Sequence, residues 1–330
     1  MAKRAGVSIK TVSRIVNDDA AVNAKTRAAV QKHLTHLNYV PNQAARQMRS
    51  GESSVIGLMT DVITTTPYSV DIVRGAQSAL QGSHGTLLIA SSEGDPEREQ
   101  ELWRMFRAHR VAGVIYAAMF HRSHDVGQPA FGESIVLANC YDVNDHRIGI
   151  VPDDEQGGYE QARYLLSRGH RRIGFITLLE ALDATYLRRS GIRRAFKDAG
   201  VSYNSDLELP GYVGKWPTET SIVRDAAFKL LKYADRPTAI ICGNDAVAMQ
   251  VYSVAAELGV SIPQDLSLIG FDDLRLISET LYPKLTTVAL PYFDIGKCAV
   301  EMMKTERKTA HQRTLVACPL VERNSCRALM

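Results

Sequence analysis

From Val55 onward, the chain alternates short apolar stretches with amphipathic stretches of helical periodicity. The alternation runs once to about residue 139 and begins again at residue 172. Alternation of this kind predicts a parallel sheet covered by helices, so two runs predict two α/β lobes with a cleft between them. Ligands bind such sheets at the carboxyl ends of their strands. We expect strands at residues 55–60, 86–91, 111–118, 134–139, 172–177, 238–243, 266–272 and 285–290. Helices are expected at 69–82, 97–109, 155–168, 187–199, 219–233, 245–258 and 292–304.

Residues 1–38 have a different pattern, typical of short helices. Ser8 is a suitable N-cap for a helix that begins at Ile9, and a second helix is expected at 25–37. At 100° per residue, the first of these helices has two distinct faces. One face carries Thr11, Val12, Ile15 and Val16, and the other carries Ile9, Lys10, Ser13, Arg14 and Asn17.

Charge is distributed unevenly along the chain. Residues 1–54 hold nine Lys or Arg against three acidic residues, a net charge of +6, so the other 276 residues sum to −3. A basic head on a nearly neutral body favours nucleic-acid binding, although a solvated basic face would give the same count. The five cysteines are scattered without metal-ligand spacing, and neither a signal peptide nor a membrane-length apolar run is found. We therefore expect a cytoplasmic protein with reduced thiols.

The run AGVSIKTVSRIVN at 5–17, followed by TRAAVQKHLTHLNYVPNQAARQMRSG at 26–51, resembles the headpiece of the lactose/galactose repressor (LacI/GalR) family. Further similar segments are VIGLMTD, VRGAQ, RVAGVI, GHRRIGFI, GNDAVAMQVY, IPQDLSLIGFDD and LTTVALP. The resemblance implies an all-α helix-turn-helix headpiece at 1–40 and a hinge helix at 41–51. An effector-binding and dimerisation domain of two parallel, periplasmic-binding-protein-like α/β lobes would follow at 52–330.

The resemblance also bears on the start of the chain. Family members begin with several more residues, which complete the first helix of the headpiece. Either the start codon lies upstream or the headpiece is weakened, and we favour the upstream start.

The resemblance assigns DNA contacts within residues 1–51. Lys10 and Arg14 would donate to guanine, and Ile9 would contact a thymine methyl group in the major groove. Ser13 and Asn17 would contact phosphates. Thr11, Tyr39 and Asn42 match further family positions that lie at the DNA. In the hinge helix, Met48 would wedge between base steps of the minor groove and Ala45 would meet the partner helix. So short a helix would fold only on DNA, and a plain linker is the alternative.

The resemblance also places an effector between the lobes. The matching residues are Asp61, Tyr68, Arg188, Trp216, Asn244, Asp245 and Asp272. Polar and aromatic side chains of these types suit a sugar, because they bond hydroxyl groups and stack on the apolar face of a pyranose. Structural roles are the alternative: Asp245 as the N-cap of a helix from Ala246, Asp272 or Asp273 as the cap of a turn, and Trp216 in a core. Leu290 stands where some relatives have a polar sugar contact, which implies a different ligand.

Together these features predict a DNA-binding transcriptional repressor whose operator affinity is controlled by a small-molecule effector, favoured to be a carbohydrate. It would bind a pseudo-palindromic operator as a homodimer, without a cofactor. The alternatives are a nucleobase- or nucleoside-responsive repressor and a solute-binding protein. An enzyme is disfavoured because the sequence has no HExxH, GxSxG, Walker or GxGxxG motif. His121 and His124 form a close histidine pair in the stretch FHRSHD; we expect them on a loop, and a metal site there is disfavoured.

Overall fold

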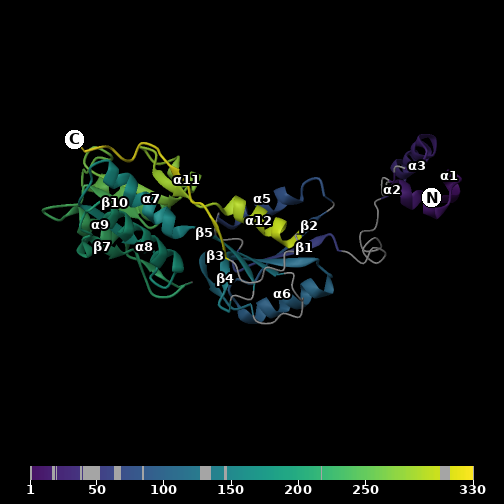
Figure 1. The fold of residues 1–330 in the computed structure, drawn as a ribbon, viewed down its shortest axis with the longest axis horizontal. Coiled ribbons are helices and arrows are strands. Elements are labelled where there is room, and N and C mark those ends of the chain that lie inside the picture. Colours follow the sequence, from purple (N-terminus) through teal and green to yellow (C-terminus); the bar gives the residue numbers. More distant parts are fainter. Residues whose placement is uncertain are drawn as a thin grey trace. The chain divides into compact units, whose positions relative to one another are not determined.

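The computed structural model describes residues 2–16, 19, 21–37, 39, 53–62, 68–83, 85–126, 135–144, 147–216, 218–304 and 313–329. The chain divides into two compact units, Met1–Ser54 and Val55–Met330 (Figure 1). We call the first the N-terminal unit and the second the body. Each is described by itself.

The N-terminal unit is helical. Its helices are α1 (Ala2–Ala5), α2 (Ile9–Val16) and α3 (Ala24–His36). Ser8 caps α2, as predicted, because its hydroxyl accepts the Thr11 amide at 3.1 Å. Asn23 caps α3 in the same way through the Lys25 amide. Ile15 of α2 and Val30 of α3 are buried and form the apolar centre of this unit.

The body contains two six-stranded sheets. The first has the order β13-β5-β4-β3-β1-β2 and the second β14-β12-β11-β10-β6-β7. Every pairing in them is parallel except that of β12 with β14. The first sheet comprises β1 (Val55–Thr60), β2 (Thr86–Ser91), β3 (Gly113–His124), β4 (Ile135–Asp142), β5 (Ile148–Pro152) and β13 (Arg313–Val316). The second comprises β6 (Ile173–Thr177), β7 (Glu208–Pro210), β10 (Ala239–Cys242), β11 (Ser267–Asp272), β12 (Thr286–Ala289) and β14 (Leu320–Val321). A separate hairpin joins β8 (Tyr212–Val213) and β9 (Thr220–Ser221).

Helices cover both faces of each sheet. In the first lobe, α5 (Tyr68–Leu80) and α12 (Tyr292–Lys304) lie on one face, with α6 (Pro96–Ala108) on the other (Figure 1). In the second lobe, α7 (Asp154–Ser167) and α8 (Asp183–Asp198) cover one face. The opposite face is covered by α9 (Val223–Leu231) and α10 (Asp245–Glu257). The short helices α11 (Arg275–Ser278) and η1 (Ser205–Leu207) complete the second lobe.

The chain passes between the two sheets three times. The crossings follow β5, β12 and β13, and backbone hydrogen bonds tie them together. The Asp153 amide donates to the Val316 carbonyl at 2.9 Å, and the Ala289 amide donates to the Pro319 carbonyl at 2.8 Å. These bonds join the crossings into one connection at the edge of the cleft.

The predicted fold class, a helical N-terminal region followed by two parallel α/β lobes, is confirmed. The expected loop at His121 and His124 is wrong, because both lie in β3. That strand resumes its pairing with β4 at Arg122 after an irregularity that begins past Ala117. The short strands β5, β7, β13 and β14 were not predicted from the sequence. In the part of the chain that the structure describes, no helix has the length and apolarity to cross a membrane.

Candidate functional site

A cavity lined by both charged and apolar side chains lies between the lobes, at the carboxyl ends of strands from both sheets. About 30 Å³ of it admits the centre of a water molecule, which is room for one or two waters. The first lobe contributes β3, β4, β5 and α12, and the second contributes the ends of α7, α8 and β11. The lining side chains are Met119, Phe120, His121, Asn139, Pro152, Asp154, Leu178, Ala184, Arg188, Asn244, Asp272, Leu290 and Tyr292.

Arg188 is the central cation of this cavity. Its guanidinium donates to the Asp154 carboxylate at 2.7 Å and to the Gly243 carbonyl at 2.6 Å. It also lies 4.0 Å from Asp272 and stacks over the Phe271 ring at 3.5 Å. The side chain is only 5% exposed. Burial lowers the pKa of Arg188, but Asp154 and Asp272 outweigh this and raise it, so Arg188 stays charged. A buried cation held by so many partners is fixed in direction.

Asp154 joins this cation to the first lobe. It is the first residue of α7 and is fully buried. One carboxylate oxygen accepts from Arg188, and the other lies 2.7 Å from Nδ1 of His121 on β3. Burial raises the pKa of Asp154, but Arg188 and the hydrogen bond from His121 outweigh it and lower the pKa below its usual value. An ionised Asp154 therefore holds His121 and Arg188 together across the lobes.

Close packing of α7 against α8 makes the Asp154–Arg188 pair possible. A Cβ on Gly158 would lie 2.7 Å from the Cα of Arg188, and one on Gly191 would lie 2.7 Å from the Tyr159 amide nitrogen. Both obstacles are backbone atoms, so only glycine permits this approach. The two glycines thus bring the start of α7 next to the arginine on α8.

Asn139 supplies an acceptor from the first lobe. Its Nδ2 donates to the Ala118 and Met119 carbonyls, both at 3.0 Å, which orients the amide. Its Oδ1 is buried and has no hydrogen-bond partner among the described residues. The residue has φ +58°, and Asp272 across the cavity has φ +112°. Strained backbone of this kind persists where the surroundings fix it and is common at functional sites.

A second inter-lobe bond lies beside His121. The Tyr141 hydroxyl of β4 donates to Asp183 of α8 at 2.7 Å, and the Tyr141 ring meets the His121 ring edge-on at 5.9 Å. Burial and the bond to Asp183 both raise the pKa of Tyr141, so it remains a neutral donor. Phe120 and Trp216 also meet edge-on between the lobes, with their centroids 6.3 Å apart.

Three of the predicted effector residues line the cavity: Arg188, Asn244 and Asp272. Asn244 also caps α10 through the Val247 amide, so the capping role proposed for Asp245 is wrong. Asp245 lies behind the lining, where it accepts from the Leu274 amide and the Thr287 hydroxyl. Trp216 packs at the edge of the second lobe's apolar core.

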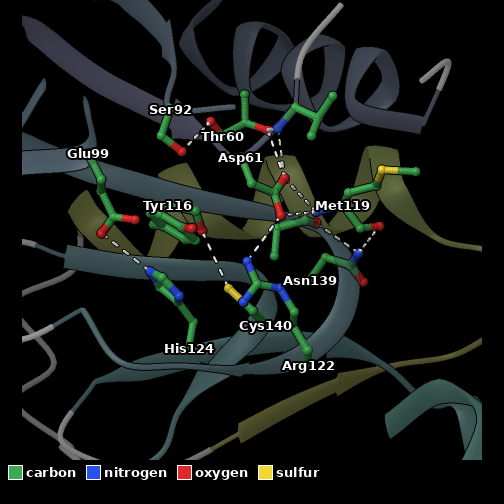
Figure 2. A network of polar contacts seen from close by, with 12 residues as sticks. Thr60, Asp61, Ser92, Glu99, Tyr116, Met119, Arg122, His124, Asn139 and Cys140 are labelled. Atoms are coloured by element: carbon green, nitrogen blue, oxygen red, sulfur yellow. Dashed lines mark hydrogen bonds and ion pairs between the residues drawn. The ribbon is translucent and has the colours of Figure 1, made fainter. Parts of the chain in front are cut away.

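Two other predicted effector residues have different outcomes. The Asp61 carboxylate is buried in the first lobe and bonds the Met119 amide and Arg122 (Figure 2). Asp61 is not among the residues that line the inter-lobe cavity. The side chain of Tyr68 lies outside the described residues.

Several cavity residues were missed by the sequence analysis, above all His121, Asn139 and Asp154. His121 was considered only as half of a metal pair. In the structure its partner is Asp154, whereas His124 stacks on Tyr116 at 4.1 Å and faces Glu99. No group of three His, Cys, Asp or Glu residues suited to a metal occurs in the described parts of the chain.

The N-terminal unit presents the residues predicted to contact DNA bases. Ile9 is 79% exposed, and Lys10 and Arg14 are also exposed on α2. Arg14 lies 3.6 Å from Asp19. Thr11 is half-buried with its hydroxyl 2.9 Å from that of Ser8, Ser13 is half-buried, and Tyr39 is exposed. The predictions for Asn17, Asn42, Ala45 and Met48 fall outside the described residues.

Comparisons with known proteins agree with this architecture. Residues 1–42 match the family model "Bacterial regulatory proteins, lacI family", and residues 162–326 match "Periplasmic binding protein-like domain". The sucrose operon repressor of Escherichia coli is 34% identical, with 98% of each chain covered. The HTH-type transcriptional repressor PurR of Pectobacterium atrosepticum is 30% identical over 94% of this chain and 91% of that one. The crystal structure of a LacI-family transcriptional regulator from Rhizobium etli is 42% identical and has a TM-score of 0.77, covering 84% of this chain and all of the other. The chain belongs to the lacI family of bacterial regulatory proteins.

Proposed function

We propose that this protein is a transcriptional repressor whose affinity for operator DNA is controlled by a small polar effector bound between the two lobes. The observation that carries the proposal is the inter-lobe cavity, in which Arg188, Asn139 and Asp272 converge from both lobes. Buried charge of this density is expensive unless it is paired or serves a ligand. The exposed residues of α2 support the DNA-binding half of the proposal.

The effector class favoured by this lining is a carbohydrate. Asn139 offers an acceptor that has no partner among the described residues, Asp272 offers a carboxylate and Arg188 a cation. Together they suit hydroxyl groups, which both donate and accept. The rings of Phe120 and Tyr292 also line the cavity, and they would serve either a sugar face or a planar base. A nucleobase is therefore the second candidate, in keeping with the 30% identity to a PurR repressor.

Control of DNA binding would follow from lobe movement. Typical small-molecule sites occupy roughly 300–1,000 Å³, so an effector needs far more room than this cavity gives. Its entry would separate the lobes and replace the bonds of His121 with Asp154 and of Tyr141 with Asp183. Residues 41–51 lie in the sequence between α3 of the N-terminal unit and β1 of the first lobe, so the lobe arrangement would bias their pairing on DNA. Coupling of about 1–3 kcal/mol would change operator affinity roughly 5–150-fold.

We further propose that the protein acts in the cytoplasm as a homodimer. Large apolar side chains are exposed on neighbouring elements of the second lobe: Met249 on α10, Leu276 on α11 and Tyr282 before β12. A second copy of this chain would cover them and supply the other half of a pseudo-palindromic operator reader. Sedimentation of the M249E/L276E variant as a monomer would support this face, and an unchanged dimer would refute it.

Two experiments test the function itself. In a thermal-shift screen, an effector present at 100 Kd would add about 2.7 kcal/mol of stability. If a nucleobase stabilises the protein and no sugar does, the effector is a nucleobase and the carbohydrate assignment is wrong.

The second experiment tests DNA binding. Arg14→Ala should reduce discrimination between operator variants by about 1–3 kcal/mol. An equal loss on all sequences would make Arg14 a phosphate contact.

A further inference from the structure

An irregularity in β3 shapes the first-lobe side of the cavity. Ala117 pairs with Ala138 of β4, but the next pair along the strands is Arg122 with Cys140. Residues 118–121 of β3 therefore face the single residue Asn139 on β4. We call residues 118–121 the β3 bulge. Bulges redirect side chains and are common beside functional sites.

The bulge is held from two sides. Asp61, at the end of β1, accepts the Met119 amide with both carboxylate oxygens, at 3.0 and 3.3 Å (Figure 2). The same carboxylate accepts from Arg122 at 3.1 Å, just after the bulge. On the other side, Asn139 donates to the Ala118 and Met119 carbonyls. Only 1% of the Asp61 side chain is exposed, so water does not weaken these bonds.

The bulge carries side chains that meet the second lobe. Met119, Phe120 and His121 all line the cavity. His121 bonds Asp154, and Phe120 meets Trp216 edge-on. The direction of both side chains is set by the bulge backbone, which Asp61 and Asn139 hold. Asp61 itself makes its contacts inside the first lobe.

We propose that Asp61, with Arg122, is a positioning residue that holds the β3 bulge in the form that closes the first lobe onto the second. It would thereby act on the effector site without touching the effector. Only the ligand-binding part of this inference rests on the proposed function, since lobe closure can be measured without a ligand.

The test uses Trp216 as a reporter of lobe closure. The chain has two tryptophans, so Trp103→Phe leaves Trp216 as the only tryptophan of the full-length protein, and its fluorescence can be excited selectively over that of tyrosine. Asp61→Asn and Arg122→Gln are made in this background. In asparagine an NH2 group replaces one of the two acceptor oxygens, and the negative charge that attracts Arg122 is lost. Asp71→Asn is the control, because Asp71 is an exposed partner of Arg74 on α5 of the same lobe.

The measurements are acrylamide quenching of Trp216, hydrogen exchange at the Met119 amide, and binding of sucrose and of adenine as probes. We expect both variants to raise the quenching constant at least twofold and to speed exchange at Met119 roughly tenfold, as a lost charge-assisted bond would. Asp71→Asn should change neither. The double variant should add little to Asp61→Asn alone, because both residues act in one contact.

The outcomes separate the two proposals. Unchanged quenching and Met119 exchange in folded Asp61→Asn would overturn the positioning role, and so would weaker probe binding with quenching unaltered. If Asp61→Asn does not fold, Arg122→Gln decides by the same criteria. If neither probe binds the parent protein, the proposed effector classes fail, while quenching and exchange still decide the role of Asp61.

Discussion

His121 of β3 and Asp154 of α7 are joined across the two lobes by a 2.7 Å contact between Nδ1 and a carboxylate oxygen. The same carboxylate also holds Arg188, so one buried anion serves a partner in each lobe. Because Asp154 is fully buried, its loss would leave Arg188 inadequately paired in a desolvated site.

We predict that Asp154→Asn destabilises the body by about 3–5 kcal/mol, the usual cost of removing one partner of a buried ion pair. Urea unfolding followed by circular dichroism would measure it. Glu155→Gln is the matched control, since Glu155 pairs with Arg194 on the surface and should cost less than about 1 kcal/mol. Equal unfolding midpoints for the two variants would contradict the role assigned to Asp154.

A second prediction is that His170 lowers the free energy of unfolding in acid. This buried ring lies between the Thr238 hydroxyl and the Arg327 carbonyl, and burial lowers its pKa. The unfolded chain takes up a proton near pH 6.5, whereas the folded chain resists it. The stability contributed by His170 is therefore full above about pH 6.5 and is lost as pH falls through the folded pKa.

We accordingly expect His170→Gln to flatten the dependence of the free energy of unfolding on pH below about 6.5. Urea midpoints taken every half unit of pH would show the change in slope. His109→Gln alters an exposed histidine and should leave the slope as it is. A parent-like slope in His170→Gln would show that another group carries the acid sensitivity.

Asp245 leads to the opposite pH dependence. Burial, reinforced by the charge of Asp272, raises its pKa to about 8. The stability it contributes is full below the unfolded pKa of about 3.9 and is lost as pH rises through the folded value. Asparagine keeps an acceptor for the Leu274 amide or the Thr287 hydroxyl but does not titrate.

Asp245→Asn should therefore change the free energy of unfolding near pH 4 by only about 1 kcal/mol and should remove part of its decline toward pH 8. Chemical unfolding at pH 4, 6 and 8 would measure this. Asp225→Asn, an exposed position on α9, provides the comparison. A decline as steep in Asp245→Asn as in the parent would mean that Asp245 is already ionised at low pH.

The layered fold could be predicted from the sequence because the spacing of apolar residues shows which face of each helix or strand is buried. Strand β1 matches its predicted bounds, and α12 was predicted to the residue. Strand β13 was missed because it is an edge strand with alternately exposed residues, and its partner β5 is distant in sequence. Short edge strands are specified by pairing more than by composition.

The candidate site was predicted in part, for a related reason. Arg188, Asn244 and Asp272 lie in motifs that the family resemblance identified, and the structure brings them to one cavity. The partner role of His121 depends on the β3 bulge, a register shift that leaves no local periodic signal. Asp154 follows another aspartate at the start of a helix, where either residue suits an N-cap; Asp153 takes that role and leaves Asp154 for the cavity.

At Gly158, helix propensity and packing predict opposite effects of an alanine substitution on stability. In an isolated helix, Gly→Ala is favourable by about 1 kcal/mol. On α7, however, the new Cβ would lie 2.7 Å from the Cα of Arg188, and backbone atoms cannot move aside as a flexible side chain can. We expect Gly158→Ala to destabilise the body by about 1–3 kcal/mol, as overpacking does, and to weaken effector binding by moving Arg188. Lys197→Ala, an exposed position on α8, should be nearly neutral in the same urea titration. A stabilised Gly158→Ala would mean that α7 and α8 can separate freely, and the glycine contact would then not set the position of Arg188.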